Sequence, residues 1–397
     1  MKREEAELLE QLQYALQAPP IPSDGLFCLQ EPEEMLALAR EHAVMPLLYH
    51  LCEVPGNLTD AQRTAIQTAA KTAVRTNYRL LFVTKFVTEY LREHGICAIV
   101  LKGVATASYY PVPELRKSGD VDLLIPGEAD FARAIELLRQ ADFEPCEKQD
   151  ALHHLELKNK EGICVEVHRI LAEPFESKKV NAYLESLLPE YGREVAENDA
   201  WGFPFCQPAD GCHAFYLILH MLQHFLRAGF GLKFLCDWVV FWNRPVEEPQ
   251  KQTFLRLVEG SRTGGFVGIM TAACVRYLGL PGERVAFILE TYPADGEVEA
   301  FMEEIFGAGE FGHVRENRMV AMRTGGILSY AREFHHQMHL NYPRAGKIFL
   351  LWPALWCATL ARFLYNNHAV RGVKSTEILR EAGKRSRLVE KMKLFSP

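Results

Sequence analysis

The chain has 397 residues with a formal net charge of −7, and 48% of the residues are hydrophobic and 24% charged. This mixture is typical of a globular protein with a sizeable core and two or three structural units. The acidic balance argues against general nucleic-acid binding, which usually requires a basic charge or a basic stripe. It remains compatible with a tRNA-sized or small-molecule acceptor.

Ten cysteines are scattered along the chain without a Cys-x-x-Cys pair, so they suggest no zinc site. The first residues, Met-Lys-Arg-Glu-Glu-Ala-Glu, are charged and lack the apolar core of a signal peptide. We therefore expect a reduced, cytoplasmic setting.

The first 95 residues are predicted to be helical. Apolar residues recur at helical spacing over 4–17, and the prolines that follow end this helix. A second helical stretch is predicted over 34–52. Thr59 is typical of an N-cap for a long helix towards His94, and Gly95 suits the end of that helix.

The pattern then changes to short runs of β-forming residues. Four of these are predicted strands: 96–101, 120–125, 152–157 and 163–168. The turn at 159–162 is expected to pair the last two as a hairpin. Short and amphipathic helices are predicted over 104–110 and 128–141, respectively.

Beyond residue 174 the helical spacing returns. Helices are predicted over 210–227, 232–242, 266–277, 298–306, 347–365 and 376–393. Residues 245–252 are predicted to form a surface loop. Residues 348–361 carry no charge, but they are shorter than the roughly 20 residues of a membrane span. We expect a buried helix there, with an interfacial helix as the lesser alternative.

Three acidic residues form the most informative pattern. Asp120 and Asp122 lie two apart in a predicted strand, so their side chains share one face. Glu166 lies in the last predicted strand and joins them if the two strands are neighbours. Converging carboxylates repel one another unless a cation neutralises them, and hard oxygen ligands favour Mg²⁺ or Mn²⁺. The pattern predicts a metal site for phosphoryl or nucleotidyl transfer, with a solvated acidic strand end as the alternative.

Residues around the acids suggest contacts with phosphate. Gly103 lacks a Cβ atom and suits a backbone that approaches phosphate closely. Arg116 and Lys117 precede the acid pair and could hold phosphates, although ordinary loop solvation explains them almost as well. His168 shares a strand face with Glu166 and could bind an acceptor or a metal-bound water, or serve as a structural imidazole.

A second group lies in the helical C-terminal half. His220 and His224 are four residues apart and share a helix face, as do Lys233 and Asp237 on the next helix. The histidine spacing could form half of a zinc site, but no glutamate follows in a His-Glu-x-x-His pattern. Hydrogen bonding between helices is the alternative.

The order of these motifs resembles the polymerase-β-like nucleotidyltransferase superfamily. Leu101-Lys102-Gly103 is followed by Asp120-Val121-Asp122-Leu123-Leu124 and later by Val165-Glu166-Val167-His168. The string is similar to an uncharacterised bacterial nucleotidyltransferase family with the pattern LKG…YP…R…DxDLL…EVH. This resemblance implies an α+β fold with a small mixed β-sheet core. We expect an N-terminal helical region over 1–95, the catalytic core over 96–200 and a C-terminal helical domain over 201–397.

The resemblance also implies an activity, the transfer of a nucleoside monophosphate from an NTP to an unidentified hydroxyl or phosphate acceptor. Asp120, Asp122 and Glu166 would hold two Mg²⁺ or Mn²⁺ ions. The implied nucleotide contacts are Lys102, Gly103, Arg116, His168, His220, His224, Lys233 and Asp237. Val104 departs from the superfamily, where a small polar residue usually follows the glycine, and Lys102 would compensate. The alternative is an inactive nucleotide-binding or partner-binding protein on the same scaffold.

Overall fold

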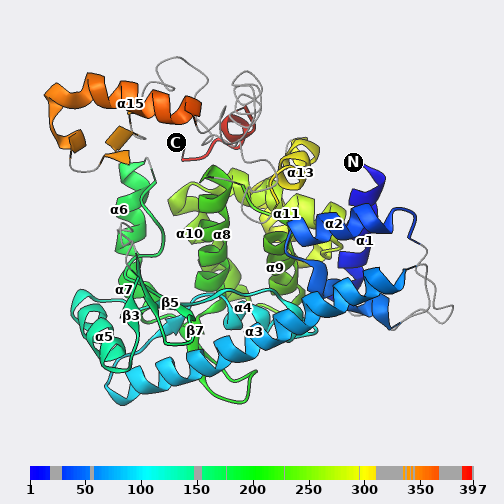
Figure 1. The fold of residues 1–397 in the computed structure, drawn as a ribbon, viewed down its shortest axis with the longest axis horizontal. Helices are drawn as coiled ribbons and strands as arrows, with labels where there is room; N and C mark the ends of the chain where they lie inside the picture. The colour runs from blue at the N-terminus through cyan, green and yellow to red at the C-terminus, as the bar shows by residue number, and fades with distance from the viewer. Residues whose placement is uncertain are drawn as a thin grey trace.

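The computed structural model describes residues 1–17, 29–53, 58–146, 154–175, 177–227, 229–294, 296–309, 334–335, 338–339, 341–342, 345–365 and 387–395. These residues form one seven-stranded mixed sheet flanked by helices (Figure 1). The predicted α+β class with a small mixed sheet is therefore confirmed. The division into three regions stays a prediction.

The N-terminal segment is helical, as predicted. Its elements are α1 (Arg3–Gln17), α2 (Pro32–Glu41), the 3₁₀ helix η1 (Met45–Cys52) and α3 (Asp60–Glu93). Thr59 and Gln62 form a capping box at the start of α3, in which each side chain accepts a hydrogen bond from the other residue's backbone N–H. The stretch predicted over 34–52 is broken, because Ala43 adopts φ +59° between α2 and η1.

Helix α3 spans the width of the molecule in Figure 1. It contacts η1 towards one end and the sheet region towards the other. It therefore connects the N-terminal helices to the strands that carry the acidic residues.

The sheet has the strand order β3-β4-β5-β2-β1-β7-β6. Its strands are β1 (Ile99–Val100), β2 (Asp120–Leu124), β3 (Glu144–Pro145), β4 (His154–Lys158), β5 (Cys164–His168), β6 (Val195–Asn198) and β7 (Phe205–Pro208). β2 and β5 pair in parallel, with Asp122 opposite Glu166. β4 pairs antiparallel with β5, which confirms the predicted hairpin.

Alternation along β2 and β5 gives the sheet two different faces. Val121, Leu123, Val165 and Val167 join a buried cluster that also contains residues of α3 and α5 (Glu128–Gln140). The residues between them, including the acids, point to the other face, where α8 (Asp210–Arg227) supplies Tyr216 and His220 to a shared cavity. This alternation places polar groups at the centre of a folded domain.

Helices dominate the remainder of the described chain. They are α4 (Val104–Ala107), α6 (Lys178–Ser186), α7 (Leu188–Tyr191), α8, α9 (Leu232–Asn243), α10 (Glu248–Ser261), α11 (Gly264–Leu278), α12 (Ala286–Thr291), α13 (Val298–Phe306) and α15 (Trp352–Tyr365), with 3₁₀ helices η2 (Pro113–Leu115), η3 (Gly282–Arg284), η5 (Ala345–Lys347) and η6 (Phe349–Leu351). α1 packs against α9 and α11, and one apolar core includes residues from Leu8 to Phe395.

Several predicted elements require correction. The strand predicted over 96–101 is only β1, and the helix predicted over 104–110 is only α4. β3, β6 and β7 are not among the predicted strands. The surface loop predicted over 245–252 is wrong, because α10 begins at Glu248 with Pro249 in its first turn, where a missing N–H costs no helical hydrogen bond. Residues 152–153 and 376–386 of two other predictions lie outside the described residues.

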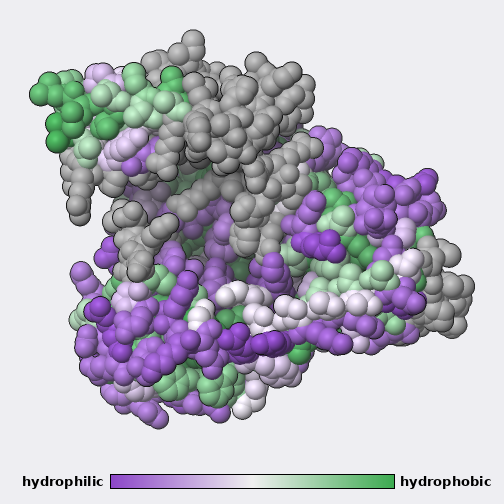
Figure 2. All heavy atoms as spheres, viewed as in Figure 1, coloured by the Kyte–Doolittle hydropathy of each residue, from purple (hydrophilic) through white to green (hydrophobic). Residues whose placement is uncertain are grey.

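The buried helix expected over 348–361 is also wrong. Phe349 and Leu350 are 70% and 85% exposed, and Trp356 on α15 is 41% exposed. Figure 2 shows a hydrophobic surface over this segment, at the upper left of the view. An uncharged apolar run indicates a tendency to be buried, but it does not specify a packing partner. No helix in the described part of the chain is long and apolar enough to cross a membrane.

Candidate active site

The three acidic residues converge on one face of the sheet. Because β2 and β5 are parallel neighbours, Asp122 and Glu166 lie directly opposite each other, and Asp120 lies two residues earlier on β2. One carboxylate oxygen from each residue lies within 4.8 Å of the others. The Asp122 side chain is fully buried, whereas Asp120 and Glu166 remain 33% and 19% exposed.

The orphaned oxygen of Asp122 fits a cation. Asp122 Oδ2 is buried and has no hydrogen-bond partner among the described residues. A buried polar atom without a partner is costly, so its position suits a bound ligand, water or ion. Three carboxylates provide hard oxygen ligands of the kind that Mg²⁺ and Mn²⁺ prefer. The residues present therefore fit the ion that the sequence predicts.

Lys102 balances the negative charge of the carboxylates in the structure. Its ammonium lies 3.1 Å from Asp122 Oδ1 and 3.9 Å from Asp120 Oδ2. Burial alone would lower the pKa of Lys102, but the two aspartates raise it well above its ordinary value. The side chain is therefore a charged counter-ion fixed between β1 and α4.

His168 joins the acids from the last position of β5. Its Nε2 atom lies 3.3 Å from Asp122 Oδ1 and 3.5 Å from Glu166 Oε2. Burial would lower the pKa of His168, but hydrogen bonding to these carboxylates raises it. Burial would raise the pKa of Glu166, but His168 and then Lys102 lower it. Glu166 is therefore ionised at neutral pH.

Lys102 contacts the first of two histidines on α8. The Lys102 ammonium donates to His220 Nε2 over 3.0 Å, and His224 Nε2 lies 3.2 Å from the same atom. Burial and then the charge of Lys102 lower the pKa of His220 well below its ordinary value and that of His224 to about 4. Both imidazoles are neutral, so they can accept or donate hydrogen bonds within the cavity.

Arg116 and Asp237 form an ion pair with each other. The guanidinium donates from Nε to Asp237 Oδ1 over 2.7 Å and from Nη2 to Oδ2 over 2.8 Å. Its Nη1 donates to Ser118 Oγ over 2.9 Å, and Tyr110 donates to Asp237 Oδ1 over 2.7 Å. This buried pair fixes the loop before Asp120 against α9, so its most direct effect is to position the acid pair.

A backbone turn holds Gly103 against β2. Gly103 has φ +64°, and a Cβ atom built on it would lie 3.1 Å from the carbonyl oxygen of Asp120. Any side chain there would be strained by the backbone conformation and crowded by the strand. Val104 is only 2% exposed and packs into the same buried cluster as Val121 and Val165. Its apolar side chain therefore offers no polar group to the cavity.

Ten of the eleven predicted site residues line one cavity of about 430 Å³, and Asp122 lies behind them. Lys233 reaches this cavity from α9. Tyr216 and His154 also line it but are not among the residues predicted from the sequence. Tyr216 lies one helical turn before His220, and His154 lies opposite His168 in the β4–β5 hairpin. The helix spacing and the hairpin register are the signals that could identify them.

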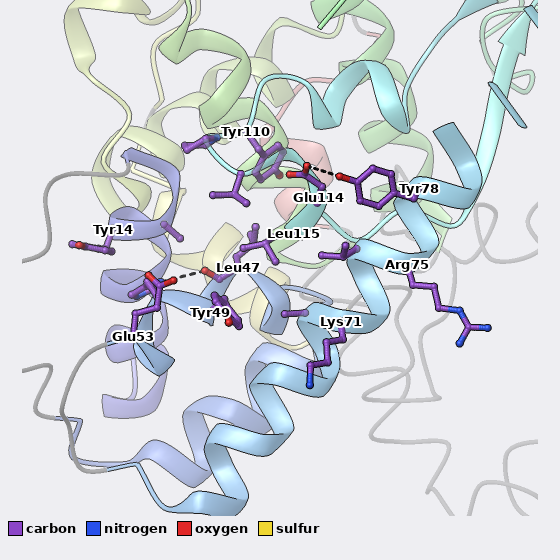
Figure 3. A pocket seen from close by; sticks show the side chains of 16 residues that line it. Tyr14, Leu47, Tyr49, Glu53, Lys71, Arg75, Tyr78, Tyr110, Glu114 and Leu115 are labelled. Carbon is purple, nitrogen blue, oxygen red and sulfur yellow. Dashed lines mark hydrogen bonds between the residues drawn. The ribbon is translucent and has the colours of Figure 1, made fainter. Parts of the chain in front are cut away.

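A second cavity, of about 700 Å³, lies between the N-terminal helices and the loop before β2 (Figure 3). Tyr14, Tyr49, Tyr78 and Tyr110 contribute to its wall. Tyr110 also donates to Asp237, a residue that lines the acidic cavity.

Comparison with known proteins gives a family match. Residues 29–279 match the family described as uncharacterised nucleotidyltransferase. No curated protein matches the chain. Among solved structures, an antigenic nucleotidyltransferase-like protein from Paracoccidioides brasiliensis is 15% identical, over 51% of this chain and 92% of that chain, with a TM-score of 0.33.

Proposed function

The chain belongs to this family of uncharacterised nucleotidyltransferases, and from that premise we propose that it transfers a nucleoside monophosphate from an NTP to a hydroxyl or phosphate acceptor. The observation that carries the proposal is the convergence of Asp120, Asp122 and Glu166 within 4.8 Å at a cavity. Three acids on adjacent strands have no structural purpose that apolar residues would not serve better.

The carboxylates would hold two divalent ions, Mg²⁺ or Mn²⁺. Bound there, the ions would supply Lewis-acid stabilisation of the charge that develops on the transferred phosphate and would lower the pKa of an acceptor hydroxyl. Asp120 and Asp122 would be the principal ligands. Glu166, ionised by its contacts with His168 and Lys102, would complete the ligand set or take the proton from the acceptor hydroxyl.

The remaining side chains would bind and orient the NTP. An acceptor oxygen forms a bond to the α-phosphorus, the bond from that phosphorus to the bridging oxygen breaks, and pyrophosphate leaves with the bonding electrons. Once the carboxylates are neutralised, the Lys102 ammonium can contact phosphate oxygens, as can Lys233 at the cavity wall. The neutral imidazoles of His220 and His224 can hydrogen-bond the nucleotide.

Thermal unfolding with nucleotides tests the proposal. A ligand that binds only the folded state raises the melting temperature. ATP, GTP, CTP and UTP are each added with and without Mg²⁺ or Mn²⁺ to the native protein and to Asp120→Asn. Asp142→Asn is the matched control, since Asp142 is an exposed partner of Lys160 away from the cavity. We expect a metal-dependent rise in the native protein and the control but not in Asp120→Asn. No rise with any nucleotide would refute the proposed site.

A second candidate function is nucleotide binding without transfer. It is favoured by Lys102, whose ammonium already neutralises Asp122, and by Val104, which supplies no hydroxyl after Gly103. This candidate predicts the same thermal stabilisation but no release of pyrophosphate with any acceptor. Pyrophosphate release therefore separates the two functions.

A further inference from the structure

A strip of metal-ligating side chains extends beyond the three acids onto β4. In the antiparallel β4–β5 pair, His154 lies opposite His168 and Glu156 lies opposite Glu166. Because residues two apart share a face, His154 and Glu156 lie on the same face of β4. The strip thus crosses three adjacent strands, with imidazoles at one end and aspartates at the other.

The imidazole end of the strip is compact. His154, Glu166 and His168 each offer a ligand atom, and these atoms all lie within 4.8 Å of one another. The two imidazole centroids are 5.1 Å apart. The His154 and His168 side chains are only 11% and 8% exposed, and all three residues line the 430 Å³ cavity.

The chemistry of this group differs from that of the three acids. Two imidazoles and one carboxylate make a ligand set that suits Zn²⁺, Co²⁺ and similar transition ions, whereas Mg²⁺ prefers oxygen ligands. Two of the ligands in tetrahedral coordination at about 2.1 Å from an ion are roughly 3.4 Å apart, so small side-chain movements would close the observed separations. Glu156, 3.4 Å from His154 Nε2, supplies a further carboxylate beside the first histidine.

We propose that His154, Glu166 and His168 bind a transition-metal ion of the Zn²⁺ or Co²⁺ type at a position next to the Mg²⁺ site, with Glu166 shared between the two. Glu166 belongs to both groups, so an ion at the imidazole end would fix the carboxylate that faces Asp122. This site goes beyond the proposed transfer reaction, because it would bind its ion without nucleotide and without turnover.

Cobalt absorbance tests this site. Co²⁺ is titrated into the chelator-treated full chain, and the visible d–d bands report binding and coordination. We expect a saturable signal in the native protein that His154→Gln weakens roughly tenfold or more. Asp120→Asn, which leaves all three proposed ligands in place, should retain the signal. His94→Gln is the matched control, since His94 is exposed at the end of α3.

Three outcomes would overturn the inference. One is equal Co²⁺ binding by His154→Gln and the native protein. Another is displacement of Co²⁺ by millimolar Mg²⁺, which would indicate an ordinary oxygen site. The third is an intense near-ultraviolet thiolate-to-cobalt band, which would assign the ion to cysteines. Circular dichroism checks that each variant is folded, and His154→Asn provides the same test if the glutamine variant is not. Failure of Co²⁺ binding would leave metal-dependent nucleotide binding at the acids intact, so the two proposals are distinguishable.

Discussion

Replacement of Lys102 by methionine tests how the acidic cluster is held together. The substitution keeps an unbranched side chain of similar size but removes the ammonium that lies 3.1 Å from Asp122 Oδ1. It leaves three carboxylates with one fewer counter-ion. Lys160→Met is the matched control, because Lys160 also pairs with an aspartate, at 2.8 Å, but both side chains are largely exposed.

The two substitutions should differ in the free energy of unfolding. At an effective dielectric of about 20, unit charges at the Lys102–Asp122 distance attract by about 5 kcal/mol, and desolvation of the ammonium offsets part of this. Removal of one partner from a buried pair typically costs about 3–5 kcal/mol. An exposed pair contributes at most about 1 kcal/mol. We therefore expect Lys102→Met to be the more destabilising by about 2–4 kcal/mol.

Urea unfolding followed by tryptophan fluorescence, in chelator and then in Mn²⁺, measures this difference. Mn²⁺ should stabilise Lys102→Met more than the native protein, because the ion replaces the lost positive charge without competing with an ammonium. Equal destabilisation by both lysine substitutions would refute the counter-ion role. A variant that Mn²⁺ does not stabilise would refute metal binding by these carboxylates.

Three further changes test neighbouring parts of the account. Asp237→Asn leaves the buried Arg116 guanidinium without its counter-ion and should cost about 3–5 kcal/mol in urea unfolding. Gly103→Ala should destabilise more than Gly162→Ala, because both glycines have positive φ but only the first would place a Cβ atom 3.1 Å from a carbonyl oxygen. Burial and then the charge of a nearby arginine lower the pKa of His213 to about 4. As the pH falls, this imidazole therefore takes up a proton in the unfolded chain before it does so in the folded one. About 3 kcal/mol of stability, fully present above pH 6.5, should be lost as the pH falls towards 4. His213→Asn should remove this loss.

Each of these expectations has a clear contrary result. An Asp237→Asn protein as stable as the native protein would show that the ion pair does not fix the loop. Equal effects of the two glycine substitutions would mean that the turn can move away from Asp120. An unchanged acid limb in the stability profile of His213→Asn would assign that limb to other groups.

The sequence predicts the centre of the site well because local rules determine it. Alternation in a strand places Asp120 and Asp122 on one face, and helical periodicity predicts the bounds of α8 and α13 as the structure has them. Capping chemistry identifies Thr59 in the same way. In each case the residues that decide the structure lie within a few positions of one another.

The missed features depend on residues far apart in the chain. β7 has only four residues, too few for a clear periodicity, and it pairs with the two-residue β1 more than 100 positions earlier. Arg116 and Asp237 each suit phosphate or nucleotide contacts when considered alone. Only tertiary packing shows that they neutralise each other. The exposure of Phe349 likewise depends on what packs beside it, which an apolar pattern does not specify.

The most direct test of nucleotidyl transfer uses NTPs labelled either at the α- or at the γ-phosphate, with Mg²⁺ and a metabolite extract as the source of acceptor. We predict that the α-label becomes covalently attached to an acceptor and that the γ-label leaves in pyrophosphate. Asp120→Asn should abolish both the attachment and the pyrophosphate release. Asp142→Asn should leave both unchanged. Transfer of the γ-label would identify a kinase instead. Undiminished transfer by Asp120→Asn would show that the three carboxylates do not catalyse the reaction.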